Sequence, residues 1–457
     1  MPLSRGSARL WWVAYLGLSA CGGGGGGDTV PDRDLPDTGA IPTEDGSVTP
    51  GDLDAGSDAS VETDAGTDAD AGDAFDGSSE EDAGPPEIVD IGPCSLDQSS
   101  VLRVEETGIY AEQPIAVSMR NEGGALAWVG LAQGGKRVVR QRWYPLYDVY
   151  GTEPDPFAML SNQTEPSSAA TASGHLTVWV DDFDARPDVR LARMSADGVR
   201  TEATVDWLTR DEATETAPVV AAGAEGRALV VWQSKAGDDA PVGRAQLLDV
   251  SGRPSGSVLT LPGYGAMIGR PALARLGAGY VLAWTDATTA AHVHLQRLDA
   301  TGAPIGSPVQ VDKSGNAQGH VDLATGTTGG AVVFDVRIAG ERGEARIRTF
   351  DTAGAWRGAE TVVGSTDTGL WPSVVALNGG FVVAYRSATA DGNALRVALH
   401  GSRGSHLGAT TVRTIDNDNL PTVLRISPDA KRLMLAWLDR VSHTNAFELH
   451  RAWVRCD

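Results

Sequence analysis

Five polar or aromatic residues recur at intervals of about fifty residues, or twice that, and could together bind a ligand: Gln113, Glu165, Arg270, His320 and Trp371. Four of them directly precede a proline, and His320 stands where a further unit would have that proline. Trp and Arg side chains often carry much of the energy of a binding site. If each residue occupies the same place in successive structural units, the five side chains meet at the rim of one channel. Solvated loop residues are the alternative interpretation.

Residues for catalysis are less evident. Glycoside hydrolysis requires two carboxylates that face the substrate, yet among the short apolar segments beside these five positions only Asp322 is acidic. His292 and His294 share one face of an expected strand and could hold a metal ion, but no third ligand lies near them in the sequence. We therefore predict a half-exposed strand face at the two histidines, and no catalytic residue, no metal and no cofactor.

The segments that must position these residues share one recurring phrase. A glycine-containing turn is followed by a short apolar run that ends on a large ring, which is typical of a buried strand. The ring recurs at spacings of 51, 53, 52, 50, 51 and 52 residues. The seven rings are those of Trp128, Trp179, Trp232, Trp284, Phe334, Tyr385 and Trp437. Identical placement in every unit indicates packing between neighbouring sheets rather than a ligand-binding cage.

Each unit follows the same plan of four strands. The proline (or His320) begins a first strand of small apolar residues, the ring ends a second, a third alternates in polarity as in "VHLQRLD", and a glycine turn leads to a fourth. Seven such units predict an all-β fold, a seven-bladed β-propeller of four-stranded antiparallel blades whose first strands line the central channel. A row of β-sandwiches is the alternative, but each sandwich needs about 100 residues.

The two ends of the repeat region predict how the ring closes. The last unit stops after its third strand, and an unassigned strand at residues 100 to 107 precedes the first unit. That strand can complete the last blade and remove its open edge. Cys94 and Cys456 flank the junction, so we predict a disulfide bond between them, as expected of an exported protein.

The N-terminus has the layout of an export signal. Arg5 and Arg9 precede an apolar run over residues 10 to 18, which is too short to span a bilayer. The phrase L-S-A-C that ends at Cys21 resembles the lipobox of bacterial lipoproteins, which implies cleavage before Cys21 and acylation of its side chain. A six-glycine tract follows and would serve as a flexible tether. An ordinary signal peptide with an incidental cysteine is the alternative.

A second compositional block separates this signal from the repeats. Residues 22 to 93 contain 20 Asp and Glu but a single Arg, among many Gly, Ala, Ser, Thr and Pro residues. Such a segment cannot bury enough apolar surface to offset the entropy of ordering, so we predict a disordered linker. Most of the net charge of −23 lies in this linker, because residues 94 to 457 carry 40 acids and 34 bases. That balance argues against nucleic-acid binding.

Several phrases resemble those of known propellers. "PSVVALNGGFVVAYRS" and "PVVAAGAEGRALVVWQS" resemble propeller-type repeats of bacterial secreted and surface proteins that have no assigned activity. In the last unit "ISPDAKRLMLAW" resembles a phrase of TolB-like and WD40-like blades, with Ala430 in place of the usual glycine. "TFDTAGAW" resembles the Asp-box of sialidase-like propellers, with one residue too many between Asp351 and Gly354. These resemblances imply a fold and not an activity.

The sequence thus predicts three parts: a lipoprotein signal at 1–20, a lipidated Cys21 with its linker to residue 93, and a propeller over 94–457. We expect an outer-membrane or cell-surface lipoprotein that acts as a non-catalytic binding or scaffold module. Its partner would be an envelope or surface protein or a glycan, with no nucleic acid, and only the lipid anchor would contact the membrane. We expect a monomer. A propeller-type hydrolase acting on glycans is the alternative, which convergent carboxylates at one channel mouth would favour.

Overall fold

A computed structural model describes residues 88–105, 109, 113–146, 161–199, 206–338, 343–364, 368–389, 392–416, 420–441 and 446–456. The expected signal, Cys21 and the linker up to residue 87 lie outside these ranges, as does the fourth strand expected for the first unit. The chain divides into two units, Met1–Ser78 and Ser79–Asp457, and every described residue belongs to the second. Its first strand begins at Ile88, earlier than the expected start of the folded domain at Cys94.

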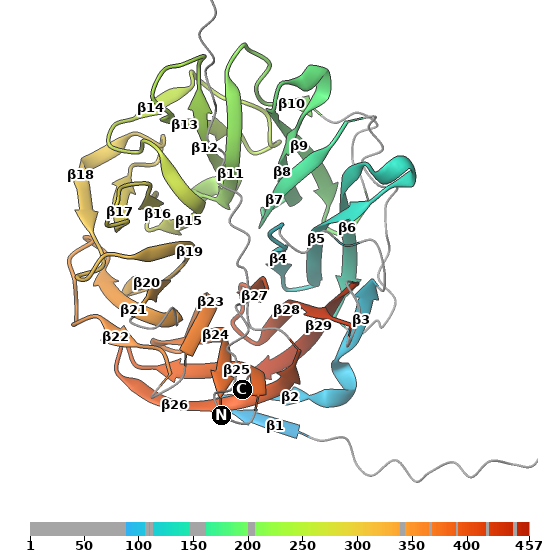
Figure 1. Cartoon of the computed structure of the whole chain (residues 1–457), viewed down its shortest axis with the longest axis vertical. Helices are drawn as coiled ribbons and strands as arrows, with labels where there is room; N and C mark the ends of the chain where they lie inside the picture. The colour runs from blue at the N-terminus through green and yellow to red at the C-terminus, as the bar shows by residue number, and fades with distance from the viewer. Residues whose placement is uncertain are drawn as a thin grey trace, which may run out of the picture. The chain divides into compact units, whose positions relative to one another are not determined.

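The second unit is a ring of antiparallel β-sheets around a central axis, which is the architecture of a β-propeller (Figure 1). Each sheet is a meander that begins with its innermost strand. The first described sheet comprises β4 (Ala116–Arg120), β5 (Gly123–Leu131) and β6 (Arg137–Pro145). The second comprises β7 (Gln163–Ala170), β8 (Gly174–Asp181), β9 (Asp188–Ser195) and β10 (Asp206–Trp207). The third comprises β11 (Thr214–Ala222), β12 (Ala228–Lys235), β13 (Val242–Leu248) and β14 (Leu259–Leu261).

An eight-stranded sheet follows, which consists of two four-stranded meanders joined by one parallel bridge between Arg270 and His320. The first meander comprises β15 (Met267–Leu276), β16 (Gly279–Asp286), β17 (Val293–Leu298) and β18 (Pro304–Gln310). The second comprises β19 (Ala317–Gly326), β20 (Gly329–Arg337), β21 (Gly343–Asp351) and β22 (Thr361–Val362). A further four-stranded sheet comprises β23 (Thr368–Leu377), β24 (Gly380–Thr389), β25 (Gly392–His400) and β26 (His406–Ile415).

The last sheet joins the two ends of the domain, as predicted. It comprises β27 (Thr422–Ile426), β28 (Arg432–Arg440), β29 (Phe447–Cys456), β1 (Ile88–Ile91), β2 (Cys94–Asp97) and β3 (Leu102–Glu105). Both β2 and β3 pair with β29. The strand expected at residues 100 to 107 is β3, and β2 is an additional strand on the other side of a short 3-10 helix. Cys94 pairs with Cys456 in this ladder and forms a disulfide bond with it.

The seven repeated rings are buried between sheets, which confirms their packing role. None of them is more than 1% exposed. Trp284 on β16, for example, shares a core cluster with Leu229 and Val231 on β12 of the preceding sheet. A second strand that is covered on both faces can be apolar along nearly its whole length, as in the buried run of β5.

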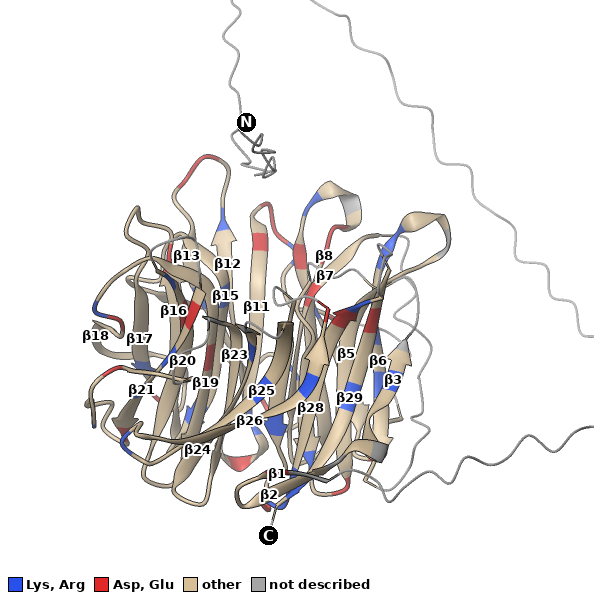
Figure 2. Ribbon diagram, turned by 60° about the horizontal axis from the view of Figure 1, so that its bottom comes forward, with Lys and Arg blue, Asp and Glu red and all other residues tan. Residues whose placement is uncertain are grey.

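Short turns complete the described part of the unit. Four 3-10 helices are η1 (Gln98–Ser100), η2 (Gln133–Gly135), η3 (Phe183–Ala185) and η4 (Ala224–Gly226). The turns at Asp249, Asp299 and Asp351 share one geometry, in which the carboxylate accepts the amide N–H groups two and four residues ahead. The phrase "TFDTAGAW" therefore forms a hairpin turn whose geometry recurs in three units. Figure 2 shows acidic and basic residues mixed over the described strands and loops.

Candidate functional site

The inner strands enclose a central cavity of about 1070 Å³. Its wall includes residues of β4, β7, β11, β15, β19, β23 and β27, which confirms that the first strand of each unit lines the channel. The five residues singled out from the sequence all line this cavity: Gln113, Glu165, Arg270, His320 and Trp371. Their role in binding stays a prediction, but the structure brings them to one space.

A repeated β-bulge positions these residues. The strand register shifts in β7, β11, β15, β19 and β23, each time close to the N-terminal end of the inner strand. A residue with left-handed backbone lies at each shift: Glu165 (φ 56°), Ala217 (φ 51°), Gly269 (φ 68°), Gly319 (φ 90°) and Trp371 (φ 51°). Bulges re-aim side chains out of the regular alternation, and a non-glycine residue in this conformation stores about 1–3 kcal/mol of strain. We call Gln113, Glu165, Ala217, Arg270, His320 and Trp371 the collar.

Side chains of the collar satisfy the backbone of the neighbouring unit. Gln113 accepts the amide N–H of Glu165 through its Oε1 at 2.9 Å. Glu165 in turn accepts the amide N–H of Ala217 through Oε2. The bulges free these amides from the strand ladder, and a buried amide without a partner costs about 1–3 kcal/mol. Gln113 and Glu165 therefore have a structural task in addition to lining the cavity.

His320 and Trp371 form a stacked pair that one buried acid holds in place. Their ring centroids lie 3.6 Å apart with the planes tilted by 24°. Asp335 on β20 contacts the Nδ1 of His320 through Oδ2 at 2.6 Å, and the same oxygen accepts the amide N–H of Trp371 at 3.3 Å. Because a carboxylate accepts, the proton lies on Nδ1, and Nε2 is the ring nitrogen left for other contacts. Sequence reasoning missed Asp335, although an acid directly after the buried ring of Phe334 was a signal.

Arg270 brings a guanidinium group to the collar, and no described acid forms an ion pair with it. Its Nε is buried and has no hydrogen-bond partner, and no hydrogen bond or ion pair links its guanidinium to another described residue. Burial lowers the pKa of Arg270 to about 10, and the nearby charge of Glu165 partly opposes that shift. Burial also raises the pKa of Glu165, against the hydrogen bond from Ala217 and the charge of Arg270. The two groups thus influence each other across the small side chain of Ala217.

A second polar cluster lies farther along the inner strands. Arg425 on β27 donates two hydrogen bonds to Asp322 on β19, at 2.8 and 3.1 Å. Ser373 on β23, between them in the ring, donates to Asp322 at 2.6 Å and accepts the amide N–H of Leu424 at 3.0 Å. Asp322 also accepts the amide N–H of Val374. The acid that the sequence offered for chemistry is therefore fully engaged in holding three inner strands together.

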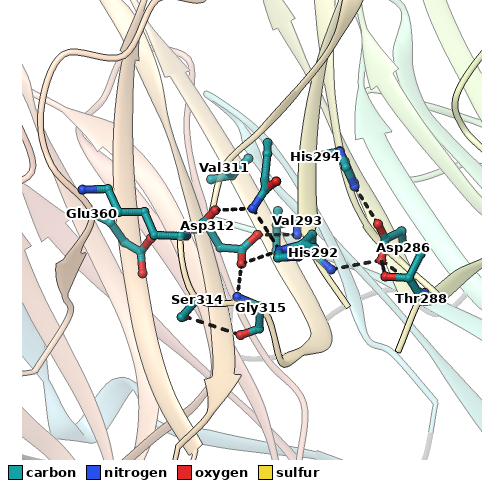
Figure 3. A network of polar contacts seen from close by, with 12 residues as sticks. Asp286, Thr288, His292, Val293, His294, Val311, Asp312, Ser314, Gly315 and Glu360 are labelled. Atoms are coloured by element: carbon teal, nitrogen blue, oxygen red, sulfur yellow. Dashed lines mark hydrogen bonds and ion pairs between the residues drawn. The ribbon is translucent and has the colours of Figure 1, made fainter. Parts of the chain in front are cut away.

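The two histidines considered as metal ligands face separate acids (Figure 3). His292 contacts Asp312 through Nδ1 at 3.0 Å, and His294 contacts Asp286 through Nε2 at 2.8 Å. Burial alone would raise the pKa of Asp286, but hydrogen bonds from the His292 amide, His294 and Thr288 lower it to about 2. Within the described ranges, no group of three or more His, Cys, Asp and Glu residues has the geometry of a metal site.

A smaller cavity of about 290 Å³ lies at the end of the second sheet, against Phe183 and Trp207. The guanidinium of Arg190 covers the ring of Trp207 at 3.5 Å and forms an ion pair with Asp181 at 3.1 Å. Arg190 and Asp181 thus compensate each other's charge beside this cavity. No helix in the described part of the chain is long and apolar enough to cross a membrane.

Comparison with known proteins supports the fold. No family model matches the chain, and neither does any curated protein, so the TolB-like and WD40-like resemblances stay predictions. An ulvan lyase of polysaccharide lyase family 25, bound to a GlcA(1-4)Rha3S unit, is 11% identical with a TM-score of 0.52 and covers 76% of this chain and 94% of its own. Polysaccharide lyase Uly1 is 8% identical with a TM-score of 0.51, and the match covers 79% of this chain and 100% of the lyase chain.

The propeller domain of the trilobed protease from Pyrococcus furiosus is 7% identical with a TM-score of 0.45, over 76% of this chain and 94% of that domain. At such identities the two lyases share a fold with this chain, and the likeness does not extend to an activity. The chain is a β-propeller of four-stranded sheets with a disulfide bond typical of exported proteins.

Proposed function

We propose that the central cavity binds a glycan and that the protein is a non-catalytic binding module of the cell envelope. The collar carries this proposal, because an arginine without an ion-pair partner, an imidazole and an indole ring line one cavity of about 1070 Å³. Hydrogen-bonding groups beside aromatic rings suit a ligand with many hydroxyl groups and apolar ring faces. A space enclosed by a ring of sheets also suits a chain of sugars better than the surface of a folded protein.

The carboxylates of the cavity favour binding over hydrolysis. Asp322 is held by Arg425 and Ser373, and Glu165 holds the amide of Ala217. A glycoside hydrolase needs one carboxyl group as acid and a second as base or nucleophile. Both candidate carboxylates already have structural partners, whereas recognition of a sugar chain needs no free acid.

An array of purified glycans probed with the full chain tests the proposal. We expect a restricted set of glycans to be retained, and Trp371→Ala to weaken their binding by about 2 kcal/mol, roughly thirtyfold. Trp356→Ala is the matched control, because Trp356 lies outside the cavity wall. Retention of envelope proteins but of no glycan would contradict the proposal.

A hydrolase acting on glycans is the second candidate. It is favoured by the burial of Glu165, which raises the pKa of this carboxyl group in the direction that a general acid requires. The two polysaccharide lyases of similar fold act on glycans, which also supports a glycan as the ligand. Incubation with glycans retained on the array, followed by chromatography, tests this candidate. Cleavage that Glu165→Gln abolishes would favour it, and intact glycan would oppose it.

The location is part of the same proposal. We infer that Cys21 is acylated and that an acidic linker holds the propeller away from an outer-membrane or cell surface. The L-S-A-C phrase after an apolar run supports the anchor, and the Cys94–Cys456 bond supports export. Intact mass and detergent partitioning of the mature protein test the anchor. A water-soluble mature form that starts elsewhere would refute it.

We further propose that the ring has seven blades and that the protein is a monomer. The seven buried rings and the two meanders of the eight-stranded sheet support this count. Pairing of β3 with β29 also supports the count, since it gives the last sheet an outer strand from the other end of the domain. An experimental structure with six or eight blades would contradict the count. Light scattering that gives the mass of a dimer would contradict the monomer.

A further inference from the structure

The geometry points to an acidic glycan as the ligand of the central cavity, with Arg270 contacting a carboxylate or sulfate group of the sugar chain. This inference rests on the proposed glycan-binding function and narrows it to one chemical class. Three features carry it: the fixed backbone under Arg270, the bonds of Asp322 and Glu165 to other partners, and the ring pair that begins on the neighbouring inner strand.

The backbone at Arg270 is held by a close approach of two strands. The parallel bridge between Arg270 and His320 joins β15 to β19. The bridge brings Gly269 and Gly319 together so closely that a Cβ atom on Gly269 would lie 1.9 Å from the carbonyl oxygen of Gly319. Both glycines have the left-handed backbone of the bulge. A fixed backbone fits a binding side chain, because less conformational entropy is lost when the ligand binds.

The acids near Arg270 are committed elsewhere. Asp322 accepts two hydrogen bonds from Arg425, which neutralises its charge. Glu165 uses Oε2 for the amide of Ala217 and forms no ion pair with Arg270 within 4.0 Å. Arg270 lies partly buried in the cavity wall without a bonded anion, and a charged group that loses part of its hydration is normally paired. The structure thus provides the cation of a charge pair, and a ligand can supply the anion.

The residues next to Arg270 fit a sugar that carries the anion. A guanidinium has donors in a planar fork that match the two oxygens of a carboxylate or sulfate. His320 follows Arg270 around the collar, and Trp371 stacks on His320 at 3.6 Å. Ala217, at the collar position on the other side of Arg270, is the collar residue with the smallest side chain. A sugar ring can contact this pair of rings while its acidic group reaches Arg270.

Matched pairs of oligosaccharides test this inference on the full chain in about 150 mM salt, which screens long-range attraction. Oligogalacturonate and its methyl ester compare a carboxylate with a neutral group on one backbone. Dextran sulfate and dextran of equal length do the same for a sulfate. We expect at least tenfold tighter binding of the charged member in one pair or both. The pair that responds distinguishes the carboxylate from the sulfate.

Two variants separate Arg270 from the general charge of the protein. Arg270→Gln should reduce binding of the charged oligosaccharide at least tenfold, and Arg270→Lys should give an intermediate loss because it keeps the charge but not the fork. Arg275→Gln is the control, because Arg275 is exposed on the same strand and lies outside the cavity wall. Thermal unfolding checks that each variant is folded.

The outcomes distinguish this inference from the proposal on which it rests. Equal binding of charged and neutral members, or unchanged binding by Arg270→Gln, overturns the acidic ligand and leaves glycan binding standing. Equal losses in Arg270→Gln and Arg275→Gln also overturn it. If no oligosaccharide binds and the glycan array is empty as well, the proposed function fails together with the inference.

Discussion

Asp322 and Arg425 form a bidentate ion pair across the cavity wall, although 103 residues and one intervening inner strand separate them. Ser373 fills the gap, donating to Asp322 and accepting from the backbone of β27. A single acid thus links the inner strands β19, β23 and β27. This cluster joins three neighbouring inner strands at the cavity wall, whereas the disulfide bond joins β2 to β29 in the last sheet.

Removing the cation of this cluster should destabilise the fold. We expect Arg425→Ala to lower the free energy of unfolding by about 2 kcal/mol, because it leaves the largely buried carboxylate of Asp322 without its counter-charge. The loss should stay below that of a fully buried pair, since Arg425 is 36% exposed. Denaturant titration measures it, with exposed Arg357→Ala as the control. If Arg425→Ala and Arg357→Ala are equally stable, the hydrogen bonds from Ser373 and from the amide of Val374 are enough to stabilise the carboxylate of Asp322.

The buried rings and the collar should respond differently to truncation. Trp284→Ala should lower the free energy of unfolding by about 3–5 kcal/mol, because the ring is 1% exposed and packs between two sheets. Trp371→Ala should cost about 1 kcal/mol from the lost stack on His320 and should mainly weaken ligand binding. Thermal unfolding of both variants, followed by binding assays, tests the contrast. A larger loss of stability for Trp371→Ala would identify the collar ring as a packing residue.

Much of the fold and the place of the site could be predicted from the sequence. The regular spacing of the large rings predicted the repeated strands, and the short apolar segments predicted the inner strands that line the cavity. Both predictions succeeded because the same positions are buried in every unit. The contacts around the collar could not be predicted. Asp335 reaches the neighbouring inner strand, and Arg425 reaches an acid two units away, so both contacts exist only once the sheets are packed. The bulges could not be predicted either. A left-handed residue is usually indicated by glycine, but here Glu165 and Trp371 adopt that backbone conformation as well.

Stability should fall as the pH rises from about 4.5 to 7, because of Glu215 on β11. Burial and the neighbouring Asp211 and Asp188 raise its pKa to about 7, although a hydrogen bond from Ser234 opposes the shift. The folded protein therefore keeps a proton that the unfolded chain releases at its ordinary pKa, and this stabilisation is complete only below that ordinary value.

Glu215→Gln should remove this pH dependence. At pH 8 we expect the variant to be more stable than the parent protein by up to about 3 kcal/mol, whereas at pH 4 the two should be similar. Urea titrations between pH 4 and 8 measure the difference. Glu212→Gln serves as the control, because Glu212 lies exposed nearby. A variant that is less stable at pH 8 would mean that Glu215 is charged and paired in the folded state.

The Cys94–Cys456 bond should contribute strongly to stability. It joins residues separated by 362 positions, and the chain-entropy model assigns a loop of that length roughly 5–6 kcal/mol. The double variant Cys94→Ser/Cys456→Ser should therefore unfold at a lower denaturant concentration. The parent protein treated with reductant should approach the same midpoint, which controls for the serine side chains. Identical midpoints with and without the bond would show that β2 and β3 close the ring without it.

The last prediction separates the packing of Gly269 from its backbone conformation. Gly269 and Gly277 both have positive φ, at 68° and 63°, so alanine at either position should cost about 1–2 kcal/mol of strain. A Cβ atom on Gly277 meets nothing within 4 Å, whereas on Gly269 it lies 1.9 Å from the carbonyl oxygen of Gly319. Gly269→Ala must therefore push β15 from β19 and displace Arg270, which the bridge to His320 holds. We expect it to lose both more stability and more glycan binding than Gly277→Ala. If the two variants bind alike, the close approach of the strands does not position Arg270.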